Sequence, residues 1–343
     1  MGDQVLTWDE ARVRDAVTAI VADAEAALDG GVWPAPQLDD VTPLDATTLY
    51  YGTAGMIWAL RRLGSSLDLD DAAAEALARC RETPTVEDAA SLYFDGEIAL
   101  LLLTRSDDER LRALIAMNAR NPSWELMQGS PGSILVARAA GFDAEACRLA
   151  EILVEEWQRH DWGLWNHVLR GHEFQMFGPA HGFVGNVHVL RDYLDEDELR
   201  ARVERVLRDY AVWNGDTVNW PAGPGHPLDR VQWCHGAPGI VATVGDLIPE
   251  DLLLGGAETT WRNGPLEKGP GLCHGTAGNG YALLKTYDLT GDEIWLERAR
   301  SFAVAALDQL QQRHSLMIGD IGAALFAQAC IDVDPRFPIL DVL

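Results

Sequence analysis

Two short segments of the sequence carry the residues best suited to chemistry. WCHGAPG spans Trp233–Gly239 and GLCHGTAG spans Gly271–Gly278, and each places a Cys-His pair directly before a Gly-x-x-Gly turn. The two cysteines, Cys234 and Cys273, lie thirty-nine residues apart, so the fold would have to bring them together. Two thiolates and one imidazole form a ligand set that suits zinc, and three protein ligands leave the fourth tetrahedral position open for a substrate.

The histidine that completes this set is either His235 or His274, because the two occupy equivalent positions after the cysteines. Three further residues stand near similar turns. His181, in GPAHGFVGN, directly precedes a turn glycine, and its imidazole is a candidate general acid or base. Glu125 lies four residues before another such turn and is a candidate acidic group. Lys268 lies five residues before the second cysteine, where an ammonium could hold the carboxylate of a metal-bound ligand.

The elements that must position these residues follow from an internal repeat. A glycine turn of the same kind occurs seven times, at intervals of 44, 33, 53, 54, 39 and 44 residues, which leaves room for two helices in each repeat. One copy is degenerate, with Ala99 in place of the second glycine. The first glycines of the seven turns are Gly52, Gly96, Gly129, Gly182, Gly236, Gly275 and Gly319.

Apolar runs of helical character follow the turns, so we predict that an inner helix begins at each turn and that an outer helix lies between consecutive turns. Glycine at the turns would permit a positive φ and a close approach of neighbouring chain. One predicted outer helix has an apolar stripe formed by Leu199, Val203, Val206, Leu207 and Tyr210. The segment T-W-D-E predicts that the first helix is capped at Thr7.

Seven hairpins with chemistry at equivalent turns favour a closed ring over an open solenoid, because a ring brings all the turns to one mouth. The Gly/Pro-dense stretch 220–229 is expected to be a loop before the fifth turn, and no linker divides the chain. We therefore expect one domain spanning residues 1–343.

Composition excludes several classes of partner. The formal net charge is −26, from 27 basic and 53 acidic residues, which disfavours binding to nucleic acid or to an anionic membrane surface. The charge serves solubility or attracts basic segments of a polypeptide substrate. Five cysteines in a chain of 343 residues do not form a disulfide framework, and the sequence shows no signal region and no apolar run of membrane-spanning length. We therefore expect a cytoplasmic protein.

With these motifs in view, nearly the whole chain resembles the LanC-like family: the bacterial lanthionine synthetase C cyclases and their eukaryotic LanC-like relatives. WCHGAPG and GLCHGTAGN are closer to the eukaryotic, glutathione-using branch, since the bacterial cyclases tend to have Tyr where His235 stands. SLMIGDIGAALF and DPRFPIL near the C-terminal end are also similar to that branch. The resemblance implies an α/α toroid of seven hairpins and the addition of a thiol to dehydroalanine or dehydrobutyrine, which forms a thioether.

The resemblance also implies roles for individual residues. Those that match the family's zinc ligands are Cys234, Cys273 and His274. His235 then matches a position that is not a ligand, and His181 matches the histidine implicated as acid or base. Glu125 matches a catalytic acidic position, which is Asp in the bacterial cyclases, and Lys268 matches a lysine linked with glutathione.

Several readings of the function stay open at the level of sequence. The expected enzyme joins glutathione or another small thiol to dehydroamino acids in proteins or peptides. A lanthipeptide cyclase would use the same chemistry with a cysteine of the same peptide. A non-catalytic scaffold would bind glutathione or a kinase. A glycosidase on an α/α toroid, suggested by the 12 Trp residues, would need paired carboxylates, whereas the turns offer thiols and imidazoles.

Overall fold

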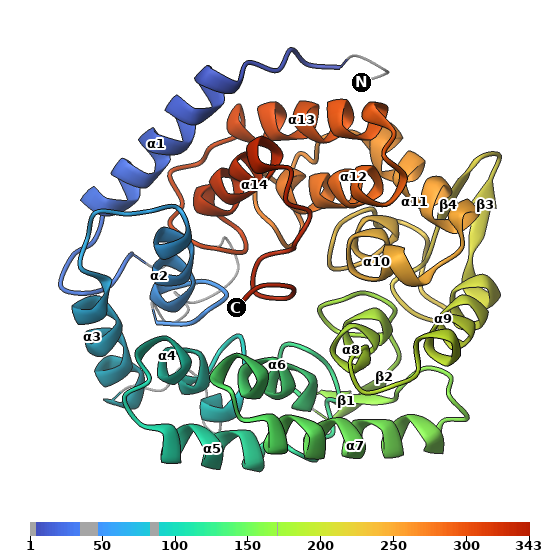
Figure 1. The fold of residues 1–343 in the computed structure, drawn as a ribbon, viewed down its shortest axis with the longest axis horizontal. Coiled ribbons are helices and arrows are strands. Elements are labelled where there is room, and N and C mark those ends of the chain that lie inside the picture. Colours follow the sequence, from blue (N-terminus) through green and yellow to red (C-terminus); the bar gives the residue numbers. More distant parts are fainter. Residues whose placement is uncertain (1–4, 35–46, 83–88, 170) are drawn as a thin grey trace.

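The structure, a computed structural model, describes residues 5–34, 47–82, 89–169 and 171–343. Its helices form two concentric rings (Figure 1). The inner helices are α2 (Thr53–Arg62), α4 (Glu97–Thr104), α6 (Ser130–Ala140), α8 (Phe183–Leu190), α10 (Ala237–Val244), α12 (Thr276–Thr290) and α14 (Asp320–Asp332). The outer helices are α1 (Glu10–Ala26), α3 (Leu69–Glu82), α5 (Asp108–Met117), α7 (Asp143–Arg159), α9 (Glu196–Tyr210), α11 (Glu250–Asn263) and α13 (Glu293–Leu307). Helix α1 packs against α14, so the first and last repeats meet and the predicted ring is closed.

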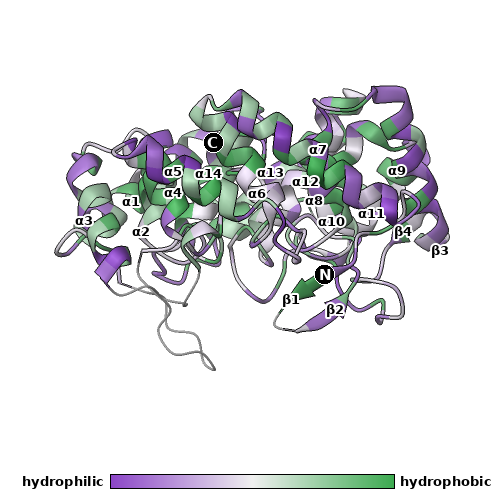
Figure 2. Cartoon of the chain, turned by 90° about the horizontal axis from the view of Figure 1, so that it is seen from below, coloured by the Kyte–Doolittle hydropathy of each residue, from purple (hydrophilic) through white to green (hydrophobic). Residues whose placement is uncertain are grey.

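Short elements complete the architecture. They are two single-turn helices, η1 (Ala89–Ser91) and η2 (Gly245–Leu247), and two antiparallel hairpins, formed by β1 (His167–Leu169) with β2 (His172–Phe174) and by β3 (Val212–Asn214) with β4 (Thr217–Asn219). The first hairpin projects from one face of the ring (Figure 2). The prediction of a nearly all-helical chain is confirmed. Among the described residues, no helix is both long enough and apolar enough to span a membrane.

Every inner helix begins at a glycine turn, as predicted. The first glycine of each repeat is the residue that precedes the first helical turn. The expectation of a positive φ at these glycines is wrong except at Gly236, where φ is 104°. Close approach is the physical reason for the second glycine. A Cβ on Gly239 would lie 1.8 Å from the carbonyl oxygen of Trp233, and one on Gly278 would lie 1.7 Å from that of Leu272. The second glycine thus lets the segment carrying each cysteine cross the start of the next helix.

The predicted start of the first helix is wrong by two residues. Helix α1 is capped by Asp9, whose carboxylate accepts a hydrogen bond from the backbone N–H of Arg12 at 3.2 Å. Asp is at least as good an N-cap as Thr, and it lies closer to the apolar stripe of the helix, so it displaces Thr7 from this role.

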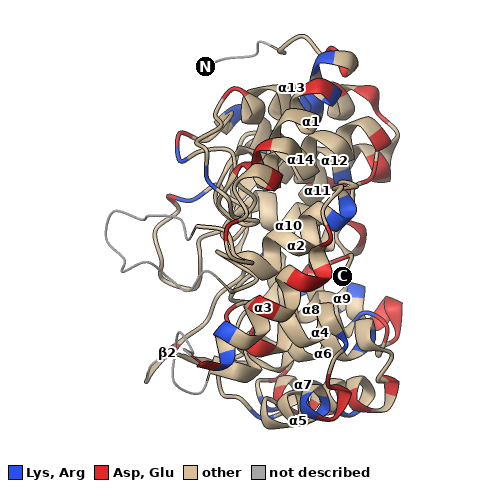
Figure 3. Ribbon diagram, turned by 90° about the vertical axis from the view of Figure 1, so that its left-hand side faces the viewer, with Lys and Arg blue, Asp and Glu red and all other residues tan. Residues whose placement is uncertain are grey.

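The outer helices are amphipathic. In α9 the predicted stripe faces inward: its first four members are buried, and the ring of Tyr210 lies 4.8 Å from that of Phe177. The buried hydrophobic residues of the inner and outer helices therefore form one core, and charged residues are found mainly on the outer helices (Figure 3).

Backbone hydrogen bonds link the turns around the ring. We call the residue two positions before the first turn glycine the hub residue of its repeat. The N–H of hub residue Cys234 donates to the carbonyl of hub residue Cys273 at 3.1 Å, and Cys273 donates to Met317 at 2.9 Å. Met317 in turn donates to Tyr50 at 3.4 Å, and Tyr50 donates to Phe94 at 3.2 Å. The last repeat is thereby joined to the first at the centre of the ring.

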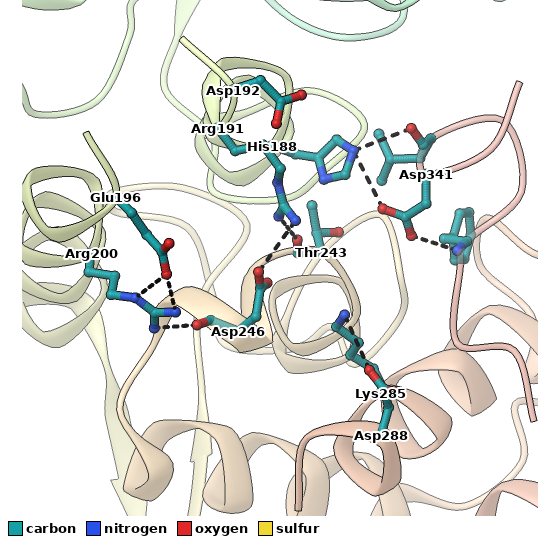
Figure 4. A network of polar contacts seen from close by, with 12 residues as sticks. His188, Arg191, Asp192, Glu196, Arg200, Thr243, Asp246, Lys285, Asp288 and Asp341 are labelled. Atoms are coloured by element: carbon teal, nitrogen blue, oxygen red, sulfur yellow. Dashed lines mark hydrogen bonds and ion pairs between the residues drawn. The ribbon is translucent and has the colours of Figure 1, made fainter. Parts of the chain in front are cut away.

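The C-terminal segment, residues 333–343, turns into the centre of the ring after α14 (Figure 1). Phe337 is buried and stacks on Trp233 with 4.4 Å between the ring centroids. His188 of α8 lies 3.5 Å from the carboxylate of Asp341 and 3.2 Å from the carbonyl oxygen of Leu340 (Figure 4). This segment therefore supports the residue that directly precedes Cys234.

Candidate functional site

The structure brings three of the predicted metal ligands together. The sulfur atoms of Cys234 and Cys273 and an imidazole nitrogen of His274 all lie within 4.8 Å of one another. Both cysteines are buried, while His274 is partly exposed. His235 lies outside this group, so the geometry selects His274 between the two equivalent histidines. Two sulfurs and one imidazole at this separation match the donor set and the dimensions of a tetrahedral zinc site.

The pKa values of the two cysteine thiols also suit the binding of a divalent cation. The hydrogen bond from Cys273 lowers the pKa of the Cys234 thiol well below its ordinary value, against the opposing effect of burial, and His274 lowers it further. The hydrogen bond to Cys234, together with burial, raises the pKa of Cys273 well above its ordinary value. The two thiols therefore differ in acidity, and Cys234 is the more readily ionised of the two. A bound cation would allow both thiols to ionise.

Each sulfur has one further hydrogen-bond donor that the sequence analysis missed. The amide Nε2 of Gln232 donates to Cys234 Sγ at 2.9 Å. The hydroxyl of Tyr50 forms a hydrogen bond with Cys273, and burial followed by the charge of that cysteine raises the pKa of Tyr50 well above its ordinary value. Tyr50 was detectable, because it is the hub residue of the first repeat and so occupies the same register as the cysteines. No repeat pattern distinguishes Gln232.

Glu125 and His181 form a pair beside the candidate metal ligands. His181 Nδ1 lies 2.9 Å from Glu125 Oε2, although fifty-six residues separate the two in the sequence. The Glu125 carboxylate is fully buried and also accepts hydrogen bonds from the backbone N–H groups of Met127 and Gln128 at 3.1 and 2.8 Å. These backbone donors hold the carboxylate in place, so it accepts Nδ1–H, and no residue in the described part of the chain forms a hydrogen bond with Nε2.

Glu125 also sets the charge of His181. Burial alone lowers the pKa of His181, but the charge of Glu125 and the hydrogen bond between them outweigh it, and the pKa is raised from its ordinary value. The ring of His235 stacks at 6.5 Å from that of His181, and burial lowers the pKa of His235. His181 is therefore the better proton donor of the two near neutral pH.

A further histidine lies close by on the β1–β2 hairpin. His167 is fully buried, and its Nδ1 lies 2.7 Å from the carbonyl oxygen of Ser123. Burial lowers the pKa of His167 to about 4, although the nearby charge of Glu125 opposes this change. His167 is therefore neutral and supports the segment that carries Glu125. The sequence analysis did not identify it, since it lies outside the glycine turns.

Lys268 contacts the candidate metal ligand Cys234 indirectly, through another side chain. Its Nζ donates to Gln232 Oε1 at 3.0 Å, and the same Gln232 donates to Cys234. The structure thus brings the six predicted site residues into one region: Cys234, Cys273, His274, His181, Glu125 and Lys268.

The sequence is similar to those of several known proteins. A family model described as lanthionine synthetase C-like protein matches residues 9–341. LanC-like protein GCL1 of Arabidopsis thaliana is 36% identical over 148 residues, which cover 40% of this chain and 34% of that protein. Glutathione S-transferase LANCL1 of Danio rerio is 38% identical over 161 residues, which cover 43% of this chain and 39% of that protein. Each match thus spans well under half of the relative's own length.

A solved structure confirms the fold. The chain superposes on nisin cyclase with a TM-score of 0.62, covering 93% of this chain and 94% of that one. The sequence identity is 14%, so this likeness concerns the fold alone. The predicted α/α toroid is therefore confirmed.

Proposed function

Since the chain belongs to the lanthionine synthetase C-like family, we propose that it adds glutathione or a similar small thiol to dehydroalanine or dehydrobutyrine residues of proteins or peptides in a zinc-dependent reaction. The observation that carries the proposal is the grouping of two cysteines and a histidine beside a buried Glu-His pair. The name of the Danio rerio relative, a glutathione S-transferase, supports glutathione as the thiol.

Cys234, Cys273 and His274 would hold the metal. When bound, zinc lowers the pKa of a coordinated substrate thiol, so that the sulfur is present as a thiolate at neutral pH. The thiolates of Cys234 and Cys273 would balance the charge of the ion, so that a coordinated substrate sulfur would retain its electron density for nucleophilic attack. Partial exposure of His274 places the ligand set at an accessible edge, where a substrate can approach.

His181 supplies the proton that completes the addition. Attack by the thiolate forms the C–S bond at the β-carbon and breaks the carbon–carbon double bond, which leaves an enolate. Nε2–H of protonated His181 then donates to the α-carbon, while Nδ1 stays hydrogen-bonded to Glu125. The thiol loses one proton and the α-carbon gains one, so the net reaction is an addition. Glu125 orients the imidazole and stabilises its charged form.

Lys268 binds the thiol substrate. Among the described residues Lys268 donates one hydrogen bond, to Gln232, which leaves two ammonium hydrogens for a carboxylate such as those of glutathione. The short path from Lys268 through Gln232 to Cys234 keeps this positive charge near the sulfur of the substrate.

The direct test is incubation of zinc-loaded protein with glutathione and a peptide that contains one dehydroalanine, followed by mass spectrometry. We expect a peptide whose mass has increased by that of one glutathione, formed faster than without protein and not formed by Cys273→Ala. A second peptide that also contains a cysteine separates the rival activity. Ring closure in preference to the glutathione adduct would identify a lanthipeptide cyclase. No acceleration with either peptide at full zinc occupancy would refute the proposed reaction.

A further inference from the structure

Gln232 occupies an unusual place between a candidate metal ligand and a candidate substrate-binding residue. Its side chain is buried, with Nε2 at 2.9 Å from Cys234 Sγ and Oε1 at 3.0 Å from Lys268 Nζ. Its backbone is also fixed, because its N–H and C=O both pair with those of His235 at 3.0 Å. Neither end of this residue is free to move independently of the site.

The chemistry of the two neighbours permits one orientation of the amide. A lysine ammonium only donates hydrogen bonds, so the end of the amide that faces Lys268 must be the oxygen. The NH₂ end must then face Cys234, where it meets an acceptor sulfur. A rotation of the amide by 180° would place the oxygen against a thiolate and the NH₂ group against an ammonium, and both contacts would be repulsive.

We propose that Gln232 is a positioning residue of the metal centre, and that Lys268 acts on Cys234 through it. This inference rests on the zinc site of the proposed function. The N–H···S hydrogen bond fixes the direction of the Cys234 side chain and withdraws charge from its sulfur. Lys268 holds the amide in the orientation that makes this bond possible. Lys268 therefore has two separable tasks, binding of the substrate carboxylate and support of the metal ligand.

The two cysteines differ in the source of their outer hydrogen bonds. Cys273 receives its outer hydrogen bond from the hydroxyl of Tyr50, which is independent of Lys268. The charge of Lys268 also acts on Cys273 through space, but its hydrogen-bond chain leads to Cys234. Substitution of Lys268 is therefore expected to disturb the hydrogen bond to Cys234 and to leave the Tyr50 hydrogen bond to Cys273 in place. A lysine that served substrate binding alone would disturb neither.

Cobalt(II) titration of the metal-free, full-length protein tests the proposal without reference to activity, because thiolate-bound cobalt has visible and near-ultraviolet absorption. Gln232→Met removes both hydrogen bonds at similar length, and Gln232→Glu keeps an acceptor for Lys268 but removes the donor to sulfur. We expect each variant to bind cobalt about 10–100-fold more weakly, the usual effect of losing an outer partner of a metal ligand. The sulfur-to-cobalt charge-transfer band should move to longer wavelength, because the sulfur becomes richer in electrons. Gln328→Met, on α14 away from the site, is the matched control and should bind as the wild type does.

A double-mutant cycle tests the role of Lys268. Lys268→Met should weaken cobalt binding in the wild-type background and should weaken it clearly less in Gln232→Met, where only the through-space effect of its charge on Cys273 remains to be lost. Additive effects would overturn the coupling. Wild-type affinity and an unshifted band in both Gln232 variants would overturn the positioning role. Should Gln232→Met fail to fold by circular dichroism, Gln232→Glu decides the question. Failure of the wild type itself to bind cobalt would instead refute the zinc site, and with it the proposed function.

Discussion

The Glu125–His181 pair gives the sharpest prediction about the reaction, through the substitution Glu125→Gln. The carboxylate accepts three hydrogen bonds: Oε2 receives those of His181 Nδ1 and the Met127 N–H, and Oε1 receives that of the Gln128 N–H. A glutamine has the same shape but only one acceptor oxygen, so its NH₂ group must face at least one backbone N–H. Leaving one buried donor without a partner costs about 1–3 kcal/mol of the free energy of unfolding.

The same substitution removes the charge that raises the pKa of His181. Burial then remains as the dominant influence and lowers that pKa, so less of the imidazole is protonated at neutral pH. A general acid contributes about 10²–10⁴-fold to a rate, and this bounds the loss. His181→Ala should lose this whole contribution to the rate. Glu125→Gln should lose part of it at neutral pH and less at acidic pH, where the His181 imidazole regains its proton.

The assay is the rate of thioether formation as a function of pH, with zinc content measured by elemental analysis in parallel. We expect the wild-type rate to fall as pH rises through the pKa of His181, and the fall in Glu125→Gln to begin at lower pH with zinc unchanged. The free energy of unfolding gives an independent readout, because it should also decrease as pH rises through the pKa of His181. A raised pKa of His181 stabilises the folded protein below the unfolded pKa, and this contribution is lost as pH rises through the folded pKa. Coincident pH–rate profiles for wild type and Glu125→Gln would refute the reasoning. Wild-type turnover by His181→Ala with full zinc would show that the proton comes from Glu125 or from solvent.

Three further predictions concern the metal, the turns and the response to acid. Cys273→Ala should abolish binding of about one zinc per chain, whereas Cys147→Ala, at an exposed position, should retain it; full occupancy in Cys273→Ala by elemental analysis would overturn the ligand assignment. Gly278→Ala should prevent folding or lower the thermal midpoint severely, because its Cβ would lie 1.7 Å from a backbone oxygen, and a midpoint within a few degrees of wild type would contradict the close-approach argument. The free energy of unfolding should decline as pH falls below 6.5, because His167 has a pKa of about 4 when folded and takes up its proton on unfolding; His167→Gln should flatten this decline in denaturant titrations, and an unchanged slope would contradict it.

Much of the architecture could be predicted because the sequence marks the points where chain crosses chain. In six of the seven repeats a glycine stands where the segment before an inner helix passes over that helix, and only the repeat with Ala99 departs from this pattern. The repeat is therefore visible without any knowledge of packing. The choice between His235 and His274 could not be predicted in this way. The two histidines occupy equivalent positions in their repeats. Only the way in which the folded ring places one turn beside the next brings His274, and not His235, next to both cysteines. Gln232 was missed for a related reason, since its role depends on a neighbour thirty-six residues away.

Hub residues explain why this fold can assemble such a centre from turns so far apart in sequence. Backbone hydrogen bonds run from Cys234 to Cys273, then to Met317 and Tyr50, in one direction around the ring. Along this run each hub residue is thus fixed relative to the next by main-chain atoms, whatever side chain it carries. Thiols at two consecutive hubs are then held side by side, and Tyr50, two hubs beyond Cys273, can still reach its sulfur. Because the backbone supplies the positioning, the chemistry of the centre depends on which side chains stand at the hubs, while the ring itself depends on the glycines that follow them.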